Sequence, residues 1–164
     1  MRKLFILCAF LLQLLSPVYP QQATTATIEP NLKYGKPSKE ALSLTSYAPD
    51  TTATAIYLFH QGQSDFIYHD GFQLTTEHWV RIKILKPQGV SYADVSVPYY
   101  SPTDKDEGQE RASEIEGCSY NMENGKCIKT PMKRESISFE RFNNLYKILK
   151  FSLPAVKEGT IIEY

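Results

Sequence analysis

The stretch Phe72–Leu85, FQLTTEHWVRIKIL, decides the fold class of this chain. Its apolar side chains recur at every second position, so in an extended chain they lie on one face while the polar side chains lie on the other. This alternation predicts a long antiparallel strand with one face in a core and the other in water. The residues that we expect to be buried together are Phe72, Leu74, Val80, Ile82 and Ile84.

Shorter segments of strand composition flank this stretch on both sides. Upstream, Ala53–His60 and Asp65–His69 read as two strands separated by a turn at Gln61-Gly62-Gln63. Downstream, strands are expected at Tyr92–Tyr100, Ile115–Met122, Lys126–Met132, Ser136–Phe142, Tyr146–Leu153 and Thr160–Tyr164. About nine strands at spacings of roughly 8–12 residues indicate an all-β, mainly antiparallel, β-sandwich-like fold. One short helix is expected near the N-terminus, with Ser38 as its N-cap.

The N-terminal segment has the layout of a secretory signal peptide. A cationic start, Met1–Lys3, precedes the apolar run Leu4–Leu15, and Ser16-Pro17 then ends any helix. The apolar run has 12 residues, whereas a helix that spans a bilayer needs about 20; a short membrane anchor is the alternative interpretation. The organisation that we predict is a signal peptide at 1–20, a flexible lead-in at 21–31 and one β module at 32–164. The protein is therefore expected to be exported to the periplasm or cell surface, with no stable membrane span after cleavage.

Two cysteines, Cys118 and Cys127, remain after removal of the signal peptide. Export makes them disulfide candidates. However, Asn124-Gly125 is a strong two-residue hairpin turn, which places Met122 opposite Cys127. Cys118 then lies four residues further along its strand, at ~13 Å, and a disulfide needs Cα atoms within about 7 Å. We therefore expect both thiols to be free.

The residues show no catalytic, cofactor-binding or metal-ligating constellation, so no site residue is assigned and an enzyme is not expected. His60, His69 and His78 recur every nine residues, without the short ligand-pair intervals that metal sites favour. His78 lies on the apolar face of the long strand, where a core histidine is the usual outcome. No helix N-terminus precedes either cysteine to activate a thiolate. The 18 basic and 18 acidic side chains balance, which argues against nucleic acid as a partner.

Two groups of surface-type residues have a functional and a plain structural interpretation. Aromatic rings could line a carbohydrate-binding surface, but rings on strands are more often packing residues; they are Tyr92, Tyr99, Tyr100 and Tyr120. A basic stretch could meet a membrane or a polysaccharide, but alternation on an exposed hairpin explains it equally well; its members are Lys126, Lys129, Lys133 and Arg134. The acid-rich run Asp104–Glu116 reads as a solvated loop.

Four ordered segments together carry a family resemblance. They are Tyr34–Ser38 (YGKPS), Arg81–Lys86 (RIKILK) followed by Gly89, Tyr120–Lys126 (YNMENGK) and Phe151–Tyr164 (FSLPAVKEGTIIEY). The chain from residue 32 to residue 164 resembles the domain of unknown function 3857, which precedes transglutaminase-like cores in exported proteins common in Bacteroidetes. The resemblance implies a mostly antiparallel β-sandwich-like domain without catalytic residues in this part.

The chain also departs from that family. The family domain continues past the position of Tyr164 through further strands, and a papain-like core with a Cys, His, Asp order follows. Here Cys118 and Cys127 both follow all three histidines. We therefore expect a module that is truncated relative to the family and incomplete at its C-terminus, with Thr160–Tyr164 as an exposed, unfinished edge strand.

The resemblance implies a function for the module. We expect a non-catalytic exported β module that packs on or positions a transglutaminase- or protease-like domain, in the same parent chain or in an associated protein. The alternative is a stand-alone carbohydrate- or peptide-binding domain. A third reading, an enzyme that uses Cys118 or Cys127, stays open because the compartment and the thiols permit it.

Overall fold

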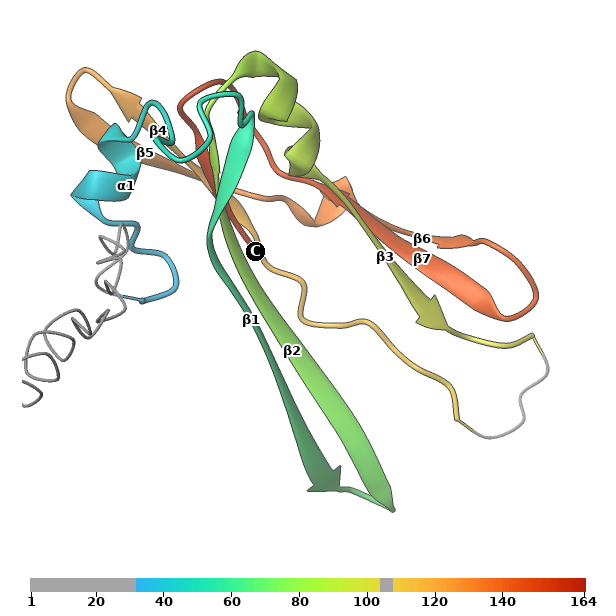
Figure 1. Ribbon diagram of the computed structural model, residues 1–164. Coiled ribbons are helices and arrows are strands. Elements are labelled where there is room, and N and C mark those ends of the chain that lie inside the picture. Colours follow the sequence, from blue (N-terminus) through green and yellow to red (C-terminus); the bar gives the residue numbers. More distant parts are fainter. Residues whose placement is uncertain (1–31, 104–107) are drawn as a thin grey trace, which may run out of the picture.

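The computed structural model describes residues 32–103 and 108–164, so the predictions for the signal peptide and the lead-in lie outside the described residues. The elements in chain order are α1 (Lys39–Ser43), β1 (Ala55–Tyr68), β2 (Phe72–Ile84), η2 (Pro87–Ala93), β3 (Asp94–Tyr100), β4 (Cys118–Glu123), β5 (Lys126–Pro131), η3 (Arg134–Ser136), β6 (Ile137–Arg141), β7 (Tyr146–Ser152) and β8 (Ile161–Glu163). The eight strands form two antiparallel sheets, ordered β1-β2-β8-β4-β5 and β3-β7-β6. The all-β, sandwich-like fold class is thereby confirmed (Figure 1).

The core lies where the two sheets meet. From the five-stranded sheet, Val80, Ile82 and Ile162 are buried against Leu149 and Phe151 of β7. The opposite face of that sheet packs on residues 33–43, where Ala41 of α1 joins a second buried cluster; its members are Ala41, Cys118, Tyr120 and Ile161. The short helix begins as expected, because the Ser38 hydroxyl accepts a hydrogen bond from the Ala41 backbone N–H at 3.0 Å.

The hairpin formed by β4 and β5 has the predicted register. Glu123 lies opposite Lys126 and Met122 opposite Cys127. Asn124 and Gly125 both have positive φ values, 50° and 75°, as a two-residue hairpin turn requires. The two cysteines are free, and Cys118 is buried whereas Cys127 is exposed. The prediction of free thiols is confirmed.

The expected turn at residues 61–63 is wrong, because β1 runs unbroken from Ala55 to Tyr68. Its partner β2 is equally continuous, and Gly62 lies directly opposite His78 in the ladder. A long partner strand therefore overrides the local turn signal of Gln61-Gly62-Gln63. The described residues hold eight strands rather than nine for the same reason.

The prediction for the long strand is correct only in part. Val80, Ile82 and Ile84 are buried, but Phe72 and Leu74 are 82% and 61% exposed. Figure 1 shows why: the far half of the β1–β2 hairpin projects away from the two sheets, and nothing among the described residues covers it. The expectation of a wet opposite face is also wrong near the core, where the polar residues Arg81 and Lys83 are buried.

The prediction of an exposed C-terminal edge strand is wrong. Strand β8 is the central strand of the five-stranded sheet, paired with β2 on one side and with β4 on the other. Ile161 and Ile162 are fully buried, and Tyr164 exchanges two backbone hydrogen bonds with Val80, at 2.7 and 3.0 Å. The last residues of this chain thus hold the two hairpins of the sheet together.

Candidate functional site

The structure does not bring the three histidines together. His60 and His78 lie on neighbouring strands with ring centroids 6.3 Å apart, while His69 lies at the far turn of the hairpin. Within residues 32–103 and 108–164, no group of three potential metal ligands is close enough to hold an ion. His78 is exposed rather than a core histidine, because it stands just beyond the point where coverage of β2 ends.

The two thiols are poorly placed for nucleophilic chemistry. The Cys118 thiol donates a hydrogen bond to the Tyr120 hydroxyl at 3.1 Å inside the protein, and burial raises the pKa of Cys118 above its ordinary value. Partial burial of the sulfur also raises the pKa of Cys127. A raised pKa disfavours the thiolate, which is the reactive form.

The tyrosines proposed for a carbohydrate surface are dispersed. Tyr120 is buried, Tyr99 packs edge-on against Phe139, and Tyr100 packs against Tyr146. Of the four, only Tyr92 is exposed, by 40%, and its ring lies beside that of Tyr57. The four residues of the basic stretch are exposed; Lys126 and Lys129 lie in β5, whereas Lys133 and Arg134 follow it. The ammonium group of Lys129 lies 5.9 Å from the centre of the Tyr120 ring.

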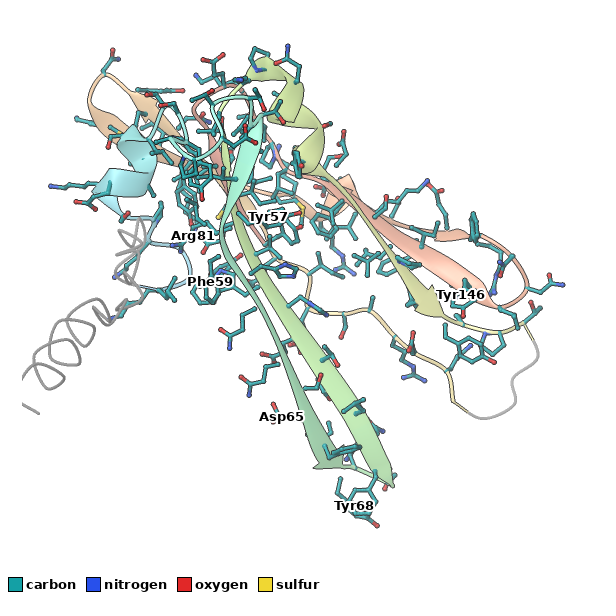
Figure 2. All side chains as sticks on the ribbon, in the orientation of Figure 1. Tyr57, Phe59, Asp65, Tyr68, Arg81 and Tyr146 are labelled. Carbon is teal, nitrogen blue, oxygen red and sulfur yellow. The ribbon has the colours of Figure 1, made fainter. Side chains whose placement is uncertain are left out.

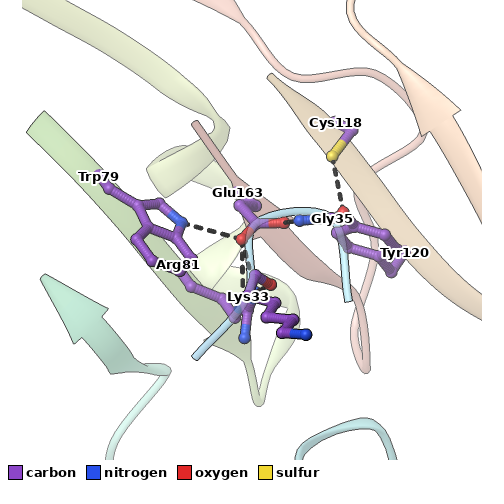
Figure 3. Close-up of polar contacts among 7 residues, drawn as sticks. All are labelled: Lys33, Gly35, Trp79, Arg81, Cys118, Tyr120 and Glu163. Carbon is purple, nitrogen blue, oxygen red and sulfur yellow. Dashed lines mark hydrogen bonds and ion pairs between the residues drawn. The ribbon is translucent and has the colours of Figure 1, made fainter. Parts of the chain in front are cut away.

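A buried carboxylate that the sequence analysis missed organises the covered face of the sheet. Glu163 and Arg81 are both 0% exposed and form an ion pair at 2.6 Å. One carboxylate oxygen of Glu163 also accepts a hydrogen bond from the Trp79 indole at 2.9 Å. The other oxygen accepts from the Gly35 backbone N–H at 2.9 Å and from the Tyr120 hydroxyl at 2.7 Å (Figure 3).

This buried cluster holds residues 33–35 against the sheet. Besides the Gly35 contact, the Arg81 guanidinium donates to the Lys33 backbone carbonyl at 2.7 Å. Burial raises the pKa of Tyr120, and the hydrogen bonds with Cys118 and Glu163 raise it further. Both carboxylate oxygens of Glu163 already accept hydrogen bonds from protein donors, so a substrate would find no free acceptor there. The role that this arrangement supports is therefore structural.

Lys83 provides a second fastening point on the same face. Its ammonium group donates to the carbonyl of Leu42, near the end of α1, at 2.8 Å and to the carbonyl of Gly159 at 2.7 Å. No carboxylate neutralises Lys83 among the described ion pairs. Burial therefore lowers the pKa of Lys83 from 10.5 to about 8.

The strongest candidate for a functional surface is the projecting half of the hairpin, residues 60–78, which we call the arm. The strand register places Phe66 opposite Leu74 and Tyr68 opposite Phe72. By the alternation along β2, these four side chains lie on the same face as Val80, which is in the core. All four are exposed, Phe66 and Tyr68 by 77% and 75%. Figure 2 shows the arm standing clear of the other side chains.

The second sheet repeats this arrangement. Val97 of β3 and Phe139 of β6 both pair with Leu149, which is in the core. Yet Val97 and Phe139 are themselves exposed. In Figure 1 the arm and the second sheet diverge as they leave the shared core. Each sheet therefore carries an apolar face that continues beyond the part covered by the other sheet.

Comparison with known proteins provides no relative: no family model, no curated protein and no solved structure matches the chain. Among the described residues, no helix has the length and apolar character needed to cross a membrane.

Proposed function

We propose that this chain is a non-catalytic, exported β module that packs on or positions a transglutaminase- or protease-like domain, in the same parent chain or in an associated protein. The apolar face of the arm is the surface through which it docks. One observation carries the proposal: Phe66, Tyr68, Phe72 and Leu74 continue the core face of the sheet and are exposed.

The energetics of the arm support a docking role. Full burial of one large apolar side chain is worth about 1.5–3 kcal/mol, so four exposed ones represent a sizeable unused driving force. A two-stranded ribbon is marginally stable by itself and normally needs a third strand or another layer. Contiguous exposed apolar patches of this kind mark interaction sites in soluble proteins.

The resemblance to domain of unknown function 3857 supports the choice of partner, because such domains precede transglutaminase-like cores. The cationic and apolar start of the sequence supports export. The raised pKa values of Cys118 and Cys127 support a non-catalytic role.

Binding to an isolated transglutaminase-like core from an exported protein of the resembling family tests the proposal. Biolayer interferometry would compare the wild-type chain with Leu74→Ser and Phe72→Ser, which remove apolar contact area from the arm. Gln73→Ser is the matched control, because Gln73 lies between them on the opposite face. We expect the first two variants to bind more weakly and the control to bind as the wild type does. Equal binding by all four proteins would refute the proposed surface.

A second candidate function, glycan or peptide binding by the domain alone, has a different surface. A shallow depression of about 250 Å³ lies on the second sheet, and its lining is rich in hydroxyl groups; it includes Ser96, Ser136, Ser138 and Ser152. Glycan-array binding that is lost in Ser138→Tyr, but kept in Leu74→Ser, would favour this function over docking through the arm.

A further inference from the structure

Strand β1 forms one edge of the five-stranded sheet, and along the arm no other described residue pairs with its outer edge. Val80 exchanges its backbone hydrogen bonds with Tyr164, so Val80 and its β1 partner His60 form a non-hydrogen-bonded pair. At the far end the His69 N–H donates to the Gly71 carbonyl at 3.0 Å. Pairs of the two kinds alternate along an antiparallel ladder. The backbone groups that point outward, away from β2, therefore belong to His60, Gly62, Ser64, Phe66 and Tyr68.

The other three sheet edges carry residues that discourage pairing with a further strand, whereas β1 carries almost none. Proline and charged side chains are the usual protection of an edge. Strand β5 has Lys126, Lys129 and Pro131; β3 has Asp94 and Pro98; β6 has Glu140 and Arg141. Strand β1 is the longest, with 14 residues, and its one charged side chain is Asp65. The sequence thus leaves open the edge that has most room for a partner.

The side chains on the two faces of the arm indicate which residue types an added strand should carry. On one face the pairs Phe66–Leu74 and Tyr68–Phe72 would extend an apolar row onto the newcomer. On the other face the side chains are polar or acidic, Asp65 and Glu77 among them, apart from Ile67 near the tip. The sequence has no Lys or Arg from Ala55 to Val80. A complementary strand therefore alternates apolar residues with basic or hydroxyl residues.

We propose that the arm receives an extended segment of the partner protein as a third strand beside β1, by β-strand addition. In this segment apolar residues alternate with Lys, Arg or Thr. The apolar residues lie beside Phe66 and Tyr68 on one face, and the Lys, Arg or Thr residues lie beside Asp65 on the other. This inference rests on the proposed function, since it states how the same arm binds. Main-chain hydrogen bonds to the five outward-facing residues supply affinity, and the alternating side chains supply specificity.

One substitution separates strand addition from simple apolar contact. Ser64→Pro removes an outward N–H without removing a bond to β2, and proline is tolerated on an edge strand in that orientation. Ser64→Ala is the matched control, because both variants lose the hydrogen bond between the Ser64 and Thr76 hydroxyls, 2.9 Å long. The probe is a fluorescent, acetylated peptide of about eight residues in which Val alternates with Thr and Lys. Anisotropy would measure its binding to the full chain.

We expect Ser64→Pro to weaken peptide binding at least about tenfold relative to Ser64→Ala. Two N-methylated versions of the peptide, each blocking one alternate set of amides, test the ladder without changing the protein. The version that blocks the N–H groups facing β1 should fail to bind the wild-type chain, and the other version should bind. Asp65→Asn combined with Glu77→Gln should weaken binding of the Lys-containing peptide but not of a version with Thr in place of Lys. Unchanged binding of both N-methylated peptides would overturn strand addition, even where Ser64→Pro disturbs the arm.

The outcome also separates this inference from the proposed function. If Leu74→Ser loses binding to the transglutaminase-like core while Ser64→Pro keeps it, docking through the apolar face stands and strand addition fails. If the chain instead forms a dimer that Ser64→Pro abolishes, and binds no peptide, the open edge belongs to a second copy and the inference is overturned.

Discussion

Two parts of strand β2 follow the same period-two alternation but differ in what covers them: Val80–Ile84 near the core and Phe72–His78 in the arm. Near the core, both faces of the strand are covered, one by the second sheet and the other by residues 33–43. In the arm, the described residues leave both faces exposed. The same strand thus has the buried, ion-paired Arg81 near one end and Phe72, which is 82% exposed, at the other.

The difference shows that alternation sets the direction of a side chain and that long-range partners set its burial. Coverage of Arg81 depends on Glu163 and on the Lys33 carbonyl, 82 and 48 positions away. Coverage of Ile82 depends on β7 and β8. Substitutions in the covered half of β2 and in the arm should therefore have different effects on stability.

The largest effect is expected from Glu163→Gln. The change removes the charge of the carboxylate that pairs with the buried Arg81 guanidinium and places an amide donor among groups that donate. Breaking a buried ion pair from one side costs about 3–5 kcal/mol. Urea unfolding would measure the loss, with Glu77→Gln in the exposed arm as the matched control, expected to change stability by less than about 0.5 kcal/mol. Similar values for both variants would mean that Glu163 is solvated in solution.

The next effect is expected from Ile82→Ala. Ile82 is 1% exposed and faces both β7 and β8. Truncation of a buried isoleucine costs about 2–5 kcal/mol, because transfer energy is lost and a cavity remains. The same unfolding assay reads this out. A loss under about 1 kcal/mol would show that the two sheets separate easily and that the contrast with the arm is weaker than the structure indicates.

Much of the architecture could be predicted from local signals. Asn124-Gly125 determined a hairpin and its register, Ser38 marked a helix start, and the alternation in β2 identified the apolar face correctly. These features depend on neighbouring residues, so sequence spacing carries the information. The position of β8 could not be predicted in this way, because the sequence of a short apolar strand is the same at an edge and in the centre of a sheet.

The buried polar cluster and the arm escaped prediction for related reasons. Arg81 and Lys83 alternate with apolar residues as they would on a wet face, and partners far away in the sequence, such as Glu163 and the Leu42 carbonyl, make their burial possible. A signal was present in Glu163, a lone acid inside the apolar run Ile161–Tyr164. The arm gave no such signal, since Phe72 and Leu74 continue the pattern of Val80 without a break.

A smaller, pH-dependent effect is expected from Lys83. Its pKa is lowered to about 8 in the folded protein against an ordinary 10.5, so between these values the unfolded chain binds more protons and stability rises with pH, by at most about 1.4 kcal/mol per pH unit. The raised pKa values of Cys118, Tyr34 and Tyr120 act in the opposite direction above their ordinary values.

The measurable window lies between about pH 8 and 9, where the phenols of the unfolded chain are still protonated. The thiols begin to ionise in this window, but they do so equally in the wild type and in a Lys83 variant, so their effect cancels in the comparison. Lys83→Met keeps the buried stem and removes the titrating amine. Unfolding free energies of the wild type and of Lys83→Met should diverge in slope across this window, with the wild type rising more steeply. Parallel curves would mean that Lys83 keeps an ordinary pKa and reaches water.

The smallest effect on the free energy of unfolding is expected from Leu74→Ala. Leu74 lies on the same strand and the same face as Ile82, eight positions away, and differs from it mainly in being 61% exposed. An exposed leucine has little transfer energy to lose and leaves no cavity, so stability should change by no more than about 0.5 kcal/mol. Addition of a docking partner reverses this expectation, because Leu74 would then enter a covered layer like that of Ile82. The complex should therefore lose affinity in Leu74→Ala although the free protein is almost unaffected. A large loss of stability in the free protein would show that the arm folds back onto its own chain in solution.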